Sequence, residues 1–178
     1  LENLLRWTRN QNGKTKIYAT LFNLTPVARQ VVSLFSAIAN AKEIELINRI
    51  EGKFDIFADE DMIKTVLRNL ISNAIKFTYT GGQVELSLAD SGDCWTIYVK
   101  DNGKGIPKDL QTHLLKSDEY ITTYGTHNEK GSGLGLILCR DFIRMNKGKL
   151  HFCSQEGIGT TFYFTIPKAS SSAKAASR

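Results

Sequence analysis

The chain has 178 residues, enough for one domain with a sizeable core but few for two. With 42% hydrophobic and 10% aromatic residues it is neither a disordered nor a fibrous sequence, and no run approaches the roughly 18 apolar residues of a membrane-spanning helix. The net charge is +5, but residues 1–16 and 168–178 each carry a surplus of +3, which leaves 16 basic and 17 acidic side chains in residues 17–167. The body of the chain therefore lacks the basic face that a nucleic-acid binder needs.

Three cysteines limit the redox and metal chemistry. Cys94, Cys139 and Cys153 are widely spaced and form no C-x-x-C pair, so neither a disulfide framework nor a zinc site is predicted. Each stands among apolar residues in the sequence, and we expect all three to be small core residues. The first seven residues lack the order of a secretory signal, and a reducing, cytoplasmic location is expected.

The two ends of the chain differ in composition from its body. Leucines and a tryptophan recur at helical spacing over residues 1–7, which predicts the end of an amphipathic helix within residues 1–14. So short a helix is not stable alone, so the rest of it or a partner helix is implied. Residues 168–178 are small and polar and predict a tail or a linker. One folded domain is therefore expected over residues 15–167.

The body of the chain contains more hairpins than β-α-β units. Strands are expected at residues 16–24, 44–50, 54–58, 84–89, 95–100, 150–154 and 160–166. Turn residues join the last six strands into three hairpins, over 44–58, 84–100 and 150–166. This pattern favours an α+β fold: a two-layer α/β sandwich with a mixed, antiparallel-rich sheet of about five strands and three main helices on one face. A doubly wound nucleotide fold is disfavoured.

The three helices have recognisable starts. One begins at Thr25-Pro26, with a cap residue before proline; a second is capped by Asp59 and runs to about Phe77; a third runs from about Leu134 to Met145. Apolar residues at helical spacing mark the expected buried face of the first helix: Val27, Val31, Leu34, Phe35 and Ile38.

A polar stripe borders the apolar arc of the second helix. Asn69, Asn73 and Lys76 lie within about 60° of one another at helical spacing. An amide oxygen is a hard, neutral ligand that suits Mg²⁺, and a lysine one turn further on adds a point charge for phosphate. A solvated helix face is the alternative, and from this pattern alone it is the better explanation.

The first glycine motif follows the strand at 95–100. In Asp101-Asn-Gly-Lys-Gly-Ile106 a carboxylate stands beside glycines whose backbone a flat ligand can approach closely. A carboxylate accepts hydrogen bonds and cannot donate them, so it suits an exocyclic amine such as that of adenine. The same residues are also good turn formers, and a plain turn is the alternative.

Two further glycine motifs come later. Gly131-Ser-Gly-Leu-Gly-Leu136 opens the third helix, where free N–H groups and the helix dipole favour phosphate, although the spacing is neither that of a P-loop nor that of a dinucleotide fingerprint. The polar stretch before it, residues 115–130, is long for a connection and predicts either a functional lid or disorder. Gly157-Ile-Gly-Thr-Thr161 turns the last hairpin.

Together, in this order, the asparagine stripe and the three glycine motifs closely resemble the ATP-binding domain of bacterial sensor histidine kinases. This domain belongs to the superfamily shared with DNA gyrase, mismatch-repair ATPases and heat-shock chaperones, and its fold is a two-layer ATP-binding sandwich. The resemblance covers residues 15–167. Residues 1–7 are similar to the end of the second helix of the dimerisation and histidine-phosphotransfer domain.

The resemblance implies ATP and Mg²⁺ as cofactors and assigns roles to residues. Asn73 would bind Mg²⁺, with Asn69 and Lys76 near the phosphates and Phe77 after them. Asp101 would bind the adenine amino group, with Thr160 near the adenine. The other implied nucleotide-binding residues belong to the glycine motifs or are lysines of the lid region: Gly103, Gly105, Ile106, Lys116, Lys130, Gly131, Ser132, Gly133, Leu134, Gly135 and Leu136. The usual phenylalanine of the segment after Ile106 is not evident.

One departure separates branches of the superfamily. Gyrase and chaperone relatives carry a glutamate at the position of Asn69, and an amide cannot remove a proton from water. Slow hydrolysis and phosphoryl transfer to a protein histidine are therefore expected. His113, His127 and His151 are expected to be surface or structural residues, since none stands beside an acidic residue in a helix.

The implied function is that of a catalytic domain without its acceptor. The phosphorylated histidine would lie on a dimerisation domain that precedes Leu1, the full protein would be a homodimer, and a response-regulator receiver would take the phosphoryl group. No nucleic acid is expected as a partner, and a membrane only if an upstream segment spans it. The alternatives are an ATPase or serine kinase of the same superfamily, and a module that binds ATP without transferring a phosphoryl group.

Overall fold

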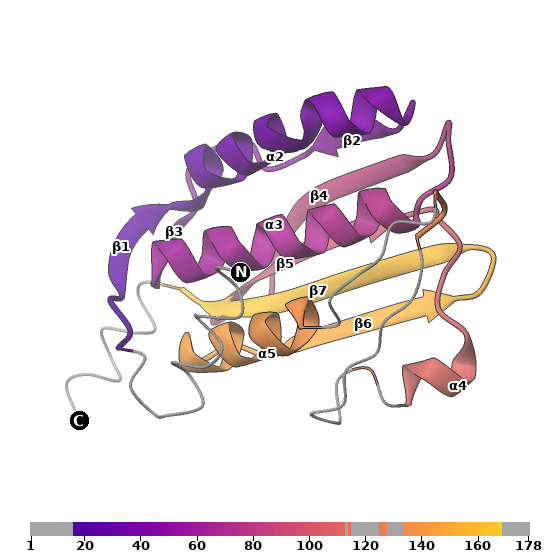
Figure 1. Cartoon of the computed structure of the whole chain (residues 1–178). Helices are drawn as coiled ribbons and strands as arrows, with labels where there is room; N and C mark the ends of the chain where they lie inside the picture. The colour runs from indigo at the N-terminus through magenta and orange to yellow at the C-terminus, as the bar shows by residue number, and fades with distance from the viewer. Residues whose placement is uncertain (1–15, 113, 115–124, 128–133, 169–178) are drawn as a thin grey trace.

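The computed structural model describes residues 16–112, 114, 125–127 and 134–168, and the elements follow one another as in Figure 1. They are β1 (Thr20–Asn23), α2 (Leu24–Ala41), β2 (Glu45–Asn48), β3 (Asp55–Ala58), α3 (Glu60–Phe77), β4 (Gln83–Asp90), β5 (Cys94–Asp101), α4 (Lys108–Gln111), α5 (Gly135–Met145), β6 (Leu150–Gln155) and β7 (Gly159–Pro167). The predicted helix at residues 1–14 and the predicted tail beyond 168 lie outside the described residues.

The main sheet has five strands in the order β2-β4-β5-β7-β6, in which β2 and β4 are parallel and the other neighbours are antiparallel. Helices α2, α3 and α5 cover one face of this sheet (Figure 1). The predicted α+β sandwich, with about five strands and three helices on one face, is therefore confirmed. A separate pair of short antiparallel strands, β1 and β3, was not expected.

The core lies between α3 and the sheet. Along α3 the apolar arc is fully buried, and Ile63, Leu67 and Leu70 each have 0% exposure. Val84 and Ile97 face it from the strands, where alternate side chains point toward the helices. Burial of each such side chain stabilises the fold by about 1.5–3 kcal/mol. This packing fixes the polar stripe of α3 along one side of the core.

The start of α3 follows from its sequence as predicted. Asp59 Oδ1 accepts a hydrogen bond from the backbone N–H of Met62 at 3.1 Å, which satisfies one of the free donors of the first turn. Glu60 and Asp61 stand in the first turn and Lys76 in the last, so the charges of the side chains oppose the helix dipole at both ends.

The predicted hairpin over residues 44–58 is wrong. Strand β2 pairs with β4 and β3 pairs with β1, so the two segments belong to different sheets. The chain turns after β2, where Asn48 Oδ1 accepts a hydrogen bond from the backbone N–H of Ile50 at 3.0 Å. Asn23 Oδ1 accepts another from the backbone N–H of Phe54 at 3.1 Å. These side-chain contacts bring the segment after β2 to the start of α2 instead of folding it back on β2.

The start and the buried face of α2 also differ from the prediction. Asn23, not Thr25, is the cap residue, since its Oδ1 accepts from the N–H of Thr25 at 3.1 Å. Leu34 and Ile38, expected in the core, are 57% and 56% exposed. Helix α2 lies over the β2 edge of the sheet (Figure 1), so the sheet covers a narrower arc of α2 than the apolar pattern suggests.

The cysteines are only partly in the core. Cys139 on α5 is buried, and burial raises the pKa of its thiol far above the ordinary value. Cys94 is half-buried and Cys153 is exposed. The expectation of three core cysteines is therefore wrong for Cys153, because β6 turns this side chain to the sheet face that α2, α3 and α5 do not cover.

Candidate functional site

A cavity of about 660 Å³, called the main cavity below, opens beside the C-terminal half of α3. The end of β5, the segment up to α4, the start of α5 and the β6–β7 turn form its other walls. Ten residues predicted from the sequence line it: Asn69, Asn73, Lys76, Phe77, Asp101, Gly105, Ile106, Gly135, Leu136 and Thr160. Segments far apart in the sequence therefore meet at one cavity.

The remaining predicted residues do not line this cavity or cannot be placed. Gly103 does not line the cavity, but its backbone N–H donates to Asp101 Oδ1. Leu134, which also does not line it, directly precedes α5. The other five predicted residues lie outside the described residues: Lys116, Lys130, Gly131, Ser132 and Gly133.

Asp101, the last residue of β5, is the buried charge of the main cavity and is only 7% exposed. Its Oδ1 accepts hydrogen bonds from the backbone N–H groups of Gly103 at 2.9 Å and Thr160 at 3.2 Å. Burial nevertheless raises the pKa of Asp101 to about 6, because the loss of water outweighs the two hydrogen bonds. Among the described residues nothing donates to Oδ2, which leaves this oxygen to accept from a ligand.

Two glycines hold the backbone around Asp101. A Cβ atom at Gly103 would lie 2.1 Å from the carbonyl oxygen of Phe77, so only glycine lets the segment after β5 pass so close to the end of α3. Gly105 has a φ of 67°, and a Cβ atom there would lie 2.1 Å from the carbonyl oxygen of Gln155. The plain-turn explanation of this motif is therefore incomplete, since these glycines also allow two backbone segments to touch.

The asparagine stripe of α3 faces the main cavity and the start of α5. Asn69 Nδ2 donates to the carbonyl oxygen of Thr65 at 2.8 Å, and its Oδ1 lies 2.8 Å from the place of a Cβ atom at Gly135. Glycine at 135 thus lets the start of α5 approach α3. No other described residue hydrogen-bonds the side chain of Asn73, so its amide oxygen is available to a ligand at the cavity wall.

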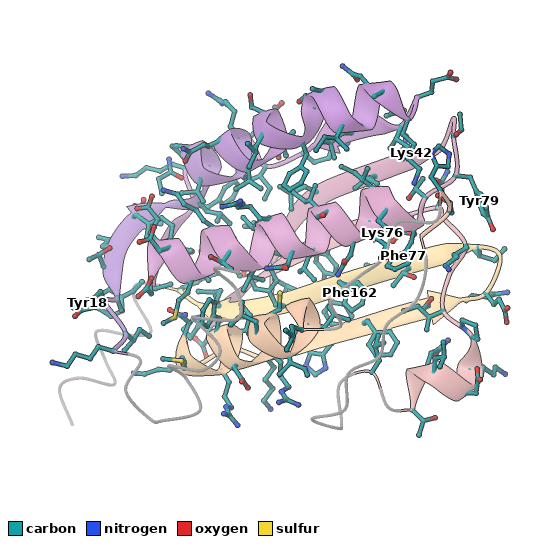
Figure 2. The ribbon with its side chains drawn as sticks, in the orientation of Figure 1. Tyr18, Lys42, Lys76, Phe77, Tyr79 and Phe162 are labelled. Carbon is teal, nitrogen blue, oxygen red and sulfur yellow. The ribbon has the colours of Figure 1, made fainter. Side chains whose placement is uncertain are left out.

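The C-terminal end of α3 gathers positive charge at the cavity. The Nζ atoms of Lys76 and Lys104 lie 4.8 Å and 5.0 Å from the ring centre of Phe77. Figure 2 shows Lys76, Phe77 and Tyr79 at this end of α3, with Phe162 on β7 beneath it. Buried Lys42 donates from Nζ to the carbonyl oxygens of Ile75 and Lys76, each at 3.0 Å, and so caps the helix.

Sequence reasoning missed part of the cavity wall. Lys104 lines the cavity but has no predicted role, although its place between two glycines of the first motif was the available signal. Leu110 and Leu114, four residues apart, also line the cavity, so an apolar pair stands in the region where the family phenylalanine is absent. Tyr79 and Glu156 also line the cavity, and no sequence signal marked either of them.

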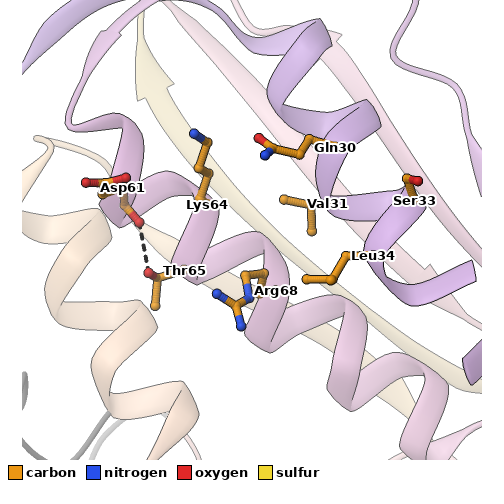
Figure 3. A pocket seen from close by; sticks show the side chains of 8 residues that line it. All are labelled: Gln30, Val31, Ser33, Leu34, Asp61, Lys64, Thr65 and Arg68. Atoms are coloured by element: carbon orange, nitrogen blue, oxygen red, sulfur yellow. Dashed lines mark hydrogen bonds between the residues drawn. The ribbon is translucent and has the colours of Figure 1, made fainter. Parts of the chain in front are cut away.

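A second cavity, of about 390 Å³, lies between α2 and α3, and no predicted site residue lines it (Figure 3). Two of its polar side chains are engaged within α3: Thr65 Oγ1 donates to the carbonyl oxygen of Asp61 at 2.8 Å, and Lys64 Nζ lies 2.7 Å from Glu60 Oε1. Of these two cavities, only the main cavity is lined by residues predicted from the sequence.

The described residues offer neither a metal-binding cluster of His, Cys, Asp or Glu nor a membrane-spanning helix. They contain no cluster of three or more His, Cys, Asp or Glu side chains suited to a metal ion. None of their helices has the length and the apolar character needed to cross a bilayer.

Known proteins match the chain over most of its length. Residues 58–170 match the family described as histidine kinase-, DNA gyrase B- and HSP90-like ATPase. The adaptive-response sensory kinase SasA of Crocosphaera subtropica is 30% identical over 94% of this chain and 44% of its own length. The circadian input-output histidine kinase CikA of Synechococcus elongatus is 30% identical over 94% of this chain and 23% of its own. The chain thus spans less than half the length of these curated relatives.

Solved structures of histidine kinases are also similar to this chain. The nucleotide-free catalytic domain of histidine kinase ThkA superposes with a TM-score of 0.72 and 31% identity, covering 85% of this chain and 96% of that one. Full-length ShkA in complex with AMPPNP gives a TM-score of 0.78 and 26% identity, covering 94% of this chain and 35% of that one. The chain therefore belongs to the histidine kinase-, DNA gyrase B- and HSP90-like ATPase family, and within it to the catalytic domains of histidine kinases.

Proposed function

We propose that this domain binds ATP with Mg²⁺ in the main cavity and transfers the γ-phosphoryl group to a histidine on a dimerisation domain. A response-regulator aspartate would then receive the phosphoryl group. The observation that carries the proposal is the pairing of a buried acceptor, Asp101, with an unengaged amide, Asn73, in one cavity. The first suits the amino group of adenine, and the second suits Mg²⁺ among phosphates.

The polarity of the cavity gives the nucleotide a direction. Asp101 and Thr160 would hold the base at the β5–β7 end, where both are buried. Asn69, Asn73 and Lys76 lie along α3 and would face the phosphates. The amide oxygen of Asn73 fits Mg²⁺ as a hard, neutral ligand, and the ion would neutralise charge on the phosphates and keep its other positions for water. Lys76 and Lys104 would add positive charge.

Among the described residues that line the cavity, no base suited to hydrolysis lies beside the asparagines. Its described acidic residues are Asp101 and Glu156, at the end of β5 and in the β6–β7 turn, whereas Asn69 and Asn73 lie on α3. An amide cannot take a proton from water, so hydrolysis should be slow and the phosphoryl group should be retained for an acceptor. This supports transfer over simple ATP hydrolysis.

The acceptor is proposed to be on another domain. His151 is exposed and stacks on Tyr163 at 5.4 Å, and His127 Nε2 lies 3.3 Å from the hydroxyl of Thr80, while His113 lies outside the described residues. Neither described histidine lies in a helix beside an acidic residue. The proposal includes a homodimer formed through a helical dimerisation domain and a receiver domain as the later partner, as the resemblance to sensor histidine kinases implies. The use of ATP and the free cysteines fit a cytoplasmic location.

The test combines this chain with a histidine-bearing dimerisation domain of the same kinase and labelled ATP. Formation of acid-labile phosphohistidine that needs both Mg²⁺ and Asp101 supports the proposal. ATP binding without any transfer, at saturating acceptor domain, would instead identify a nucleotide-sensing module. Failure of the wild-type domain to bind ATP would refute the proposal.

A further inference from the structure

We propose that Ser154 fixes the direction of the Thr160 hydroxyl, so that the inner wall of the main cavity only accepts hydrogen bonds and selects a purine with a 6-amino group over one with a 6-oxo group. The proposal rests on the nucleotide binding proposed above. It assigns a role to Ser154, a β6 residue outside all four sequence motifs.

Ser154 stands at a junction of three hydrogen bonds. Its Oγ accepts from the backbone N–H of Ile106 at 2.9 Å and donates to the carbonyl oxygen of Gly159 at 3.1 Å. The same Oγ lies 2.9 Å from Thr160 Oγ1. Ser154 therefore links the first glycine motif to the start of β7, where Thr160 lines the cavity.

The direction of the Ser154–Thr160 hydrogen bond follows from counting protons. A serine hydroxyl has one proton and two lone pairs. The N–H of Ile106 can only donate, so it uses one lone pair, and the carbonyl of Gly159 can only accept, so it takes the proton. All three contacts exist together only when Thr160 donates to the second lone pair of Ser154. The hydroxyl proton of Thr160 then points at Ser154 and away from a ligand.

Thr160 is consequently an acceptor toward the cavity, next to another acceptor. Its backbone N–H already donates to Asp101 Oδ1 at 3.2 Å, and the second carboxylate oxygen of Asp101 receives no hydrogen bond from the described residues. Thr160 and Asp101 are only 6% and 7% exposed, so water cannot freely reorganise around them. A ligand group that donates is accepted here, and one that only accepts is opposed by both residues.

Adenine and hypoxanthine differ where this matters. Adenine carries a 6-amino group, which donates, whereas hypoxanthine carries a 6-oxo group, which only accepts. If Ser154 were absent, the Thr160 hydroxyl could rotate and donate to a 6-oxo group directly or through a water molecule. Ser154 would thus act as a positioning residue, with its effect on selectivity exerted through Thr160.

The experiment measures the dissociation constants of ATP and ITP with Mg²⁺, by calorimetry, for the wild-type chain and for Ser154→Ala. The wild type should bind ATP in preference to ITP, and Ser154→Ala should reduce the ITP-to-ATP ratio of dissociation constants by about fivefold, the size of one neutral hydrogen bond. In a Thr160→Val background, Ser154→Ala should leave this ratio unchanged, because the hydroxyl that it orients is gone.

Ser91→Ala is the matched control. Ser91 Oγ lies 2.7 Å from Thr96 Oγ1, so the variant breaks a similar serine–threonine pair beside the other end of β5, and it should leave the ratio unchanged. An unchanged ratio in Ser154→Ala, an equal affinity of the wild type for both nucleotides, or the same drop in the Thr160→Val background would overturn the inference. A wild-type chain that binds neither nucleotide would instead refute the proposed function.

Discussion

Replacing Asp101 by asparagine should make the nucleotide-free domain more stable while strongly lowering its affinity for ATP. The carboxylate is 7% exposed, and burial raises its pKa from 3.8 to about 6. A difference of one between the folded and unfolded pKa corresponds to about 1.4 kcal/mol. The ionised carboxylate therefore lowers the free energy of unfolding by about 3 kcal/mol at neutral pH. An amide in its place carries no charge, but its own burial reduces the gain, so we expect Asp101→Asn to add about 1–3 kcal/mol at pH 7.5.

The pH dependence gives the sign of this effect. Above pH 6 the carboxylate is ionised in both the folded and the unfolded chain, so the full penalty of its burial is present. As the pH falls from 6 toward 3.8, the folded chain takes up a proton before the unfolded chain does, and the penalty disappears. The advantage of Asp101→Asn should therefore be largest above pH 6 and should vanish near pH 4.

Nucleotide binding should change in the opposite direction. The asparagine Oδ1 can accept from the N–H groups of Gly103 and Thr160, as Asp101 does, but its NH₂ group then faces the donating amino group of adenine. A flipped amide would instead direct its NH₂ group at those two N–H donors. No orientation satisfies both sides, so we expect affinity for ATP to fall by about 100-fold, the loss of a charged hydrogen bond.

Urea unfolding of nucleotide-free protein at a series of pH values, with calorimetric ATP titrations, tests both halves. Asp109→Asn is the matched control, since Asp109 is exposed on α4 and lines no cavity. A variant less stable than the wild type at pH 7.5, or a gain of equal size at pH 4 and pH 7.5, would show that desolvation of Asp101 is not what limits the stability. Retained ATP affinity would refute the role of Asp101 in binding the base.

Three further substitutions test other parts of the site. Asn73→Ala should abolish the increase in ATP affinity that Mg²⁺ brings, as measured by titration with Mg²⁺ and with EDTA; an equal dependence on Mg²⁺ afterwards would return this residue to a solvated helix face. Gly105→Ala should lower the free energy of unfolding by about 2–3 kcal/mol in urea, because a Cβ atom would meet the Gln155 carbonyl oxygen at 2.1 Å at a φ of 67°; unchanged stability would contradict this close contact. Lys42→Met should cost about 1–3 kcal/mol by the same measurement, since the carbonyl oxygen of Ile75 loses the ammonium donor, whereas that of Lys76 keeps the backbone N–H of Thr126 at 3.1 Å; a neutral result would show that water replaces the ammonium group.

Predictions from the sequence succeeded where the determining contacts are local. Asp59 caps α3 by accepting a hydrogen bond from the N–H of Met62, only three residues away. The hairpins β4–β5 and β6–β7 likewise close over short turns. They failed for β2 and β3, whose partners lie on distant strands and whose connection is set by Asn48 and Asn23. They also failed at Leu34 and Ile38, because the width of the buried arc depends on how α2 lies over the sheet edge.

The same distinction holds for the cavity. Glycines and a carboxylate carry a signal because few other residues tolerate a φ of 67° or a backbone contact near 2 Å, so Gly103 and Gly105 could be singled out from sequence alone. Leu110 and Leu114 are ordinary residue types, and nothing in the sequence distinguishes a leucine of a cavity wall from one of the core. Ser154 was missed for a further reason: the predicted hairpin places it beside Thr160, but nothing in the sequence shows that the N–H of Ile106 also donates to it, and the direction of its hydrogen bonds depends on that contact.

The stability argument and the binding argument meet at Asp101. If this side chain served only to hold the backbone of Gly103 and Thr160, asparagine would make the same two hydrogen bonds without an ionised group in a buried place. The carboxylate gains nothing from the fold that an amide would not, and it destabilises the fold at neutral pH. We therefore expect its advantage in the occupied cavity, where the second oxygen of a carboxylate would accept from a donating ligand and the NH₂ group of an amide could not. The burial of Asp101 and its two backbone hydrogen bonds therefore support its proposed role in ligand binding, independently of the glycine motif in which it stands.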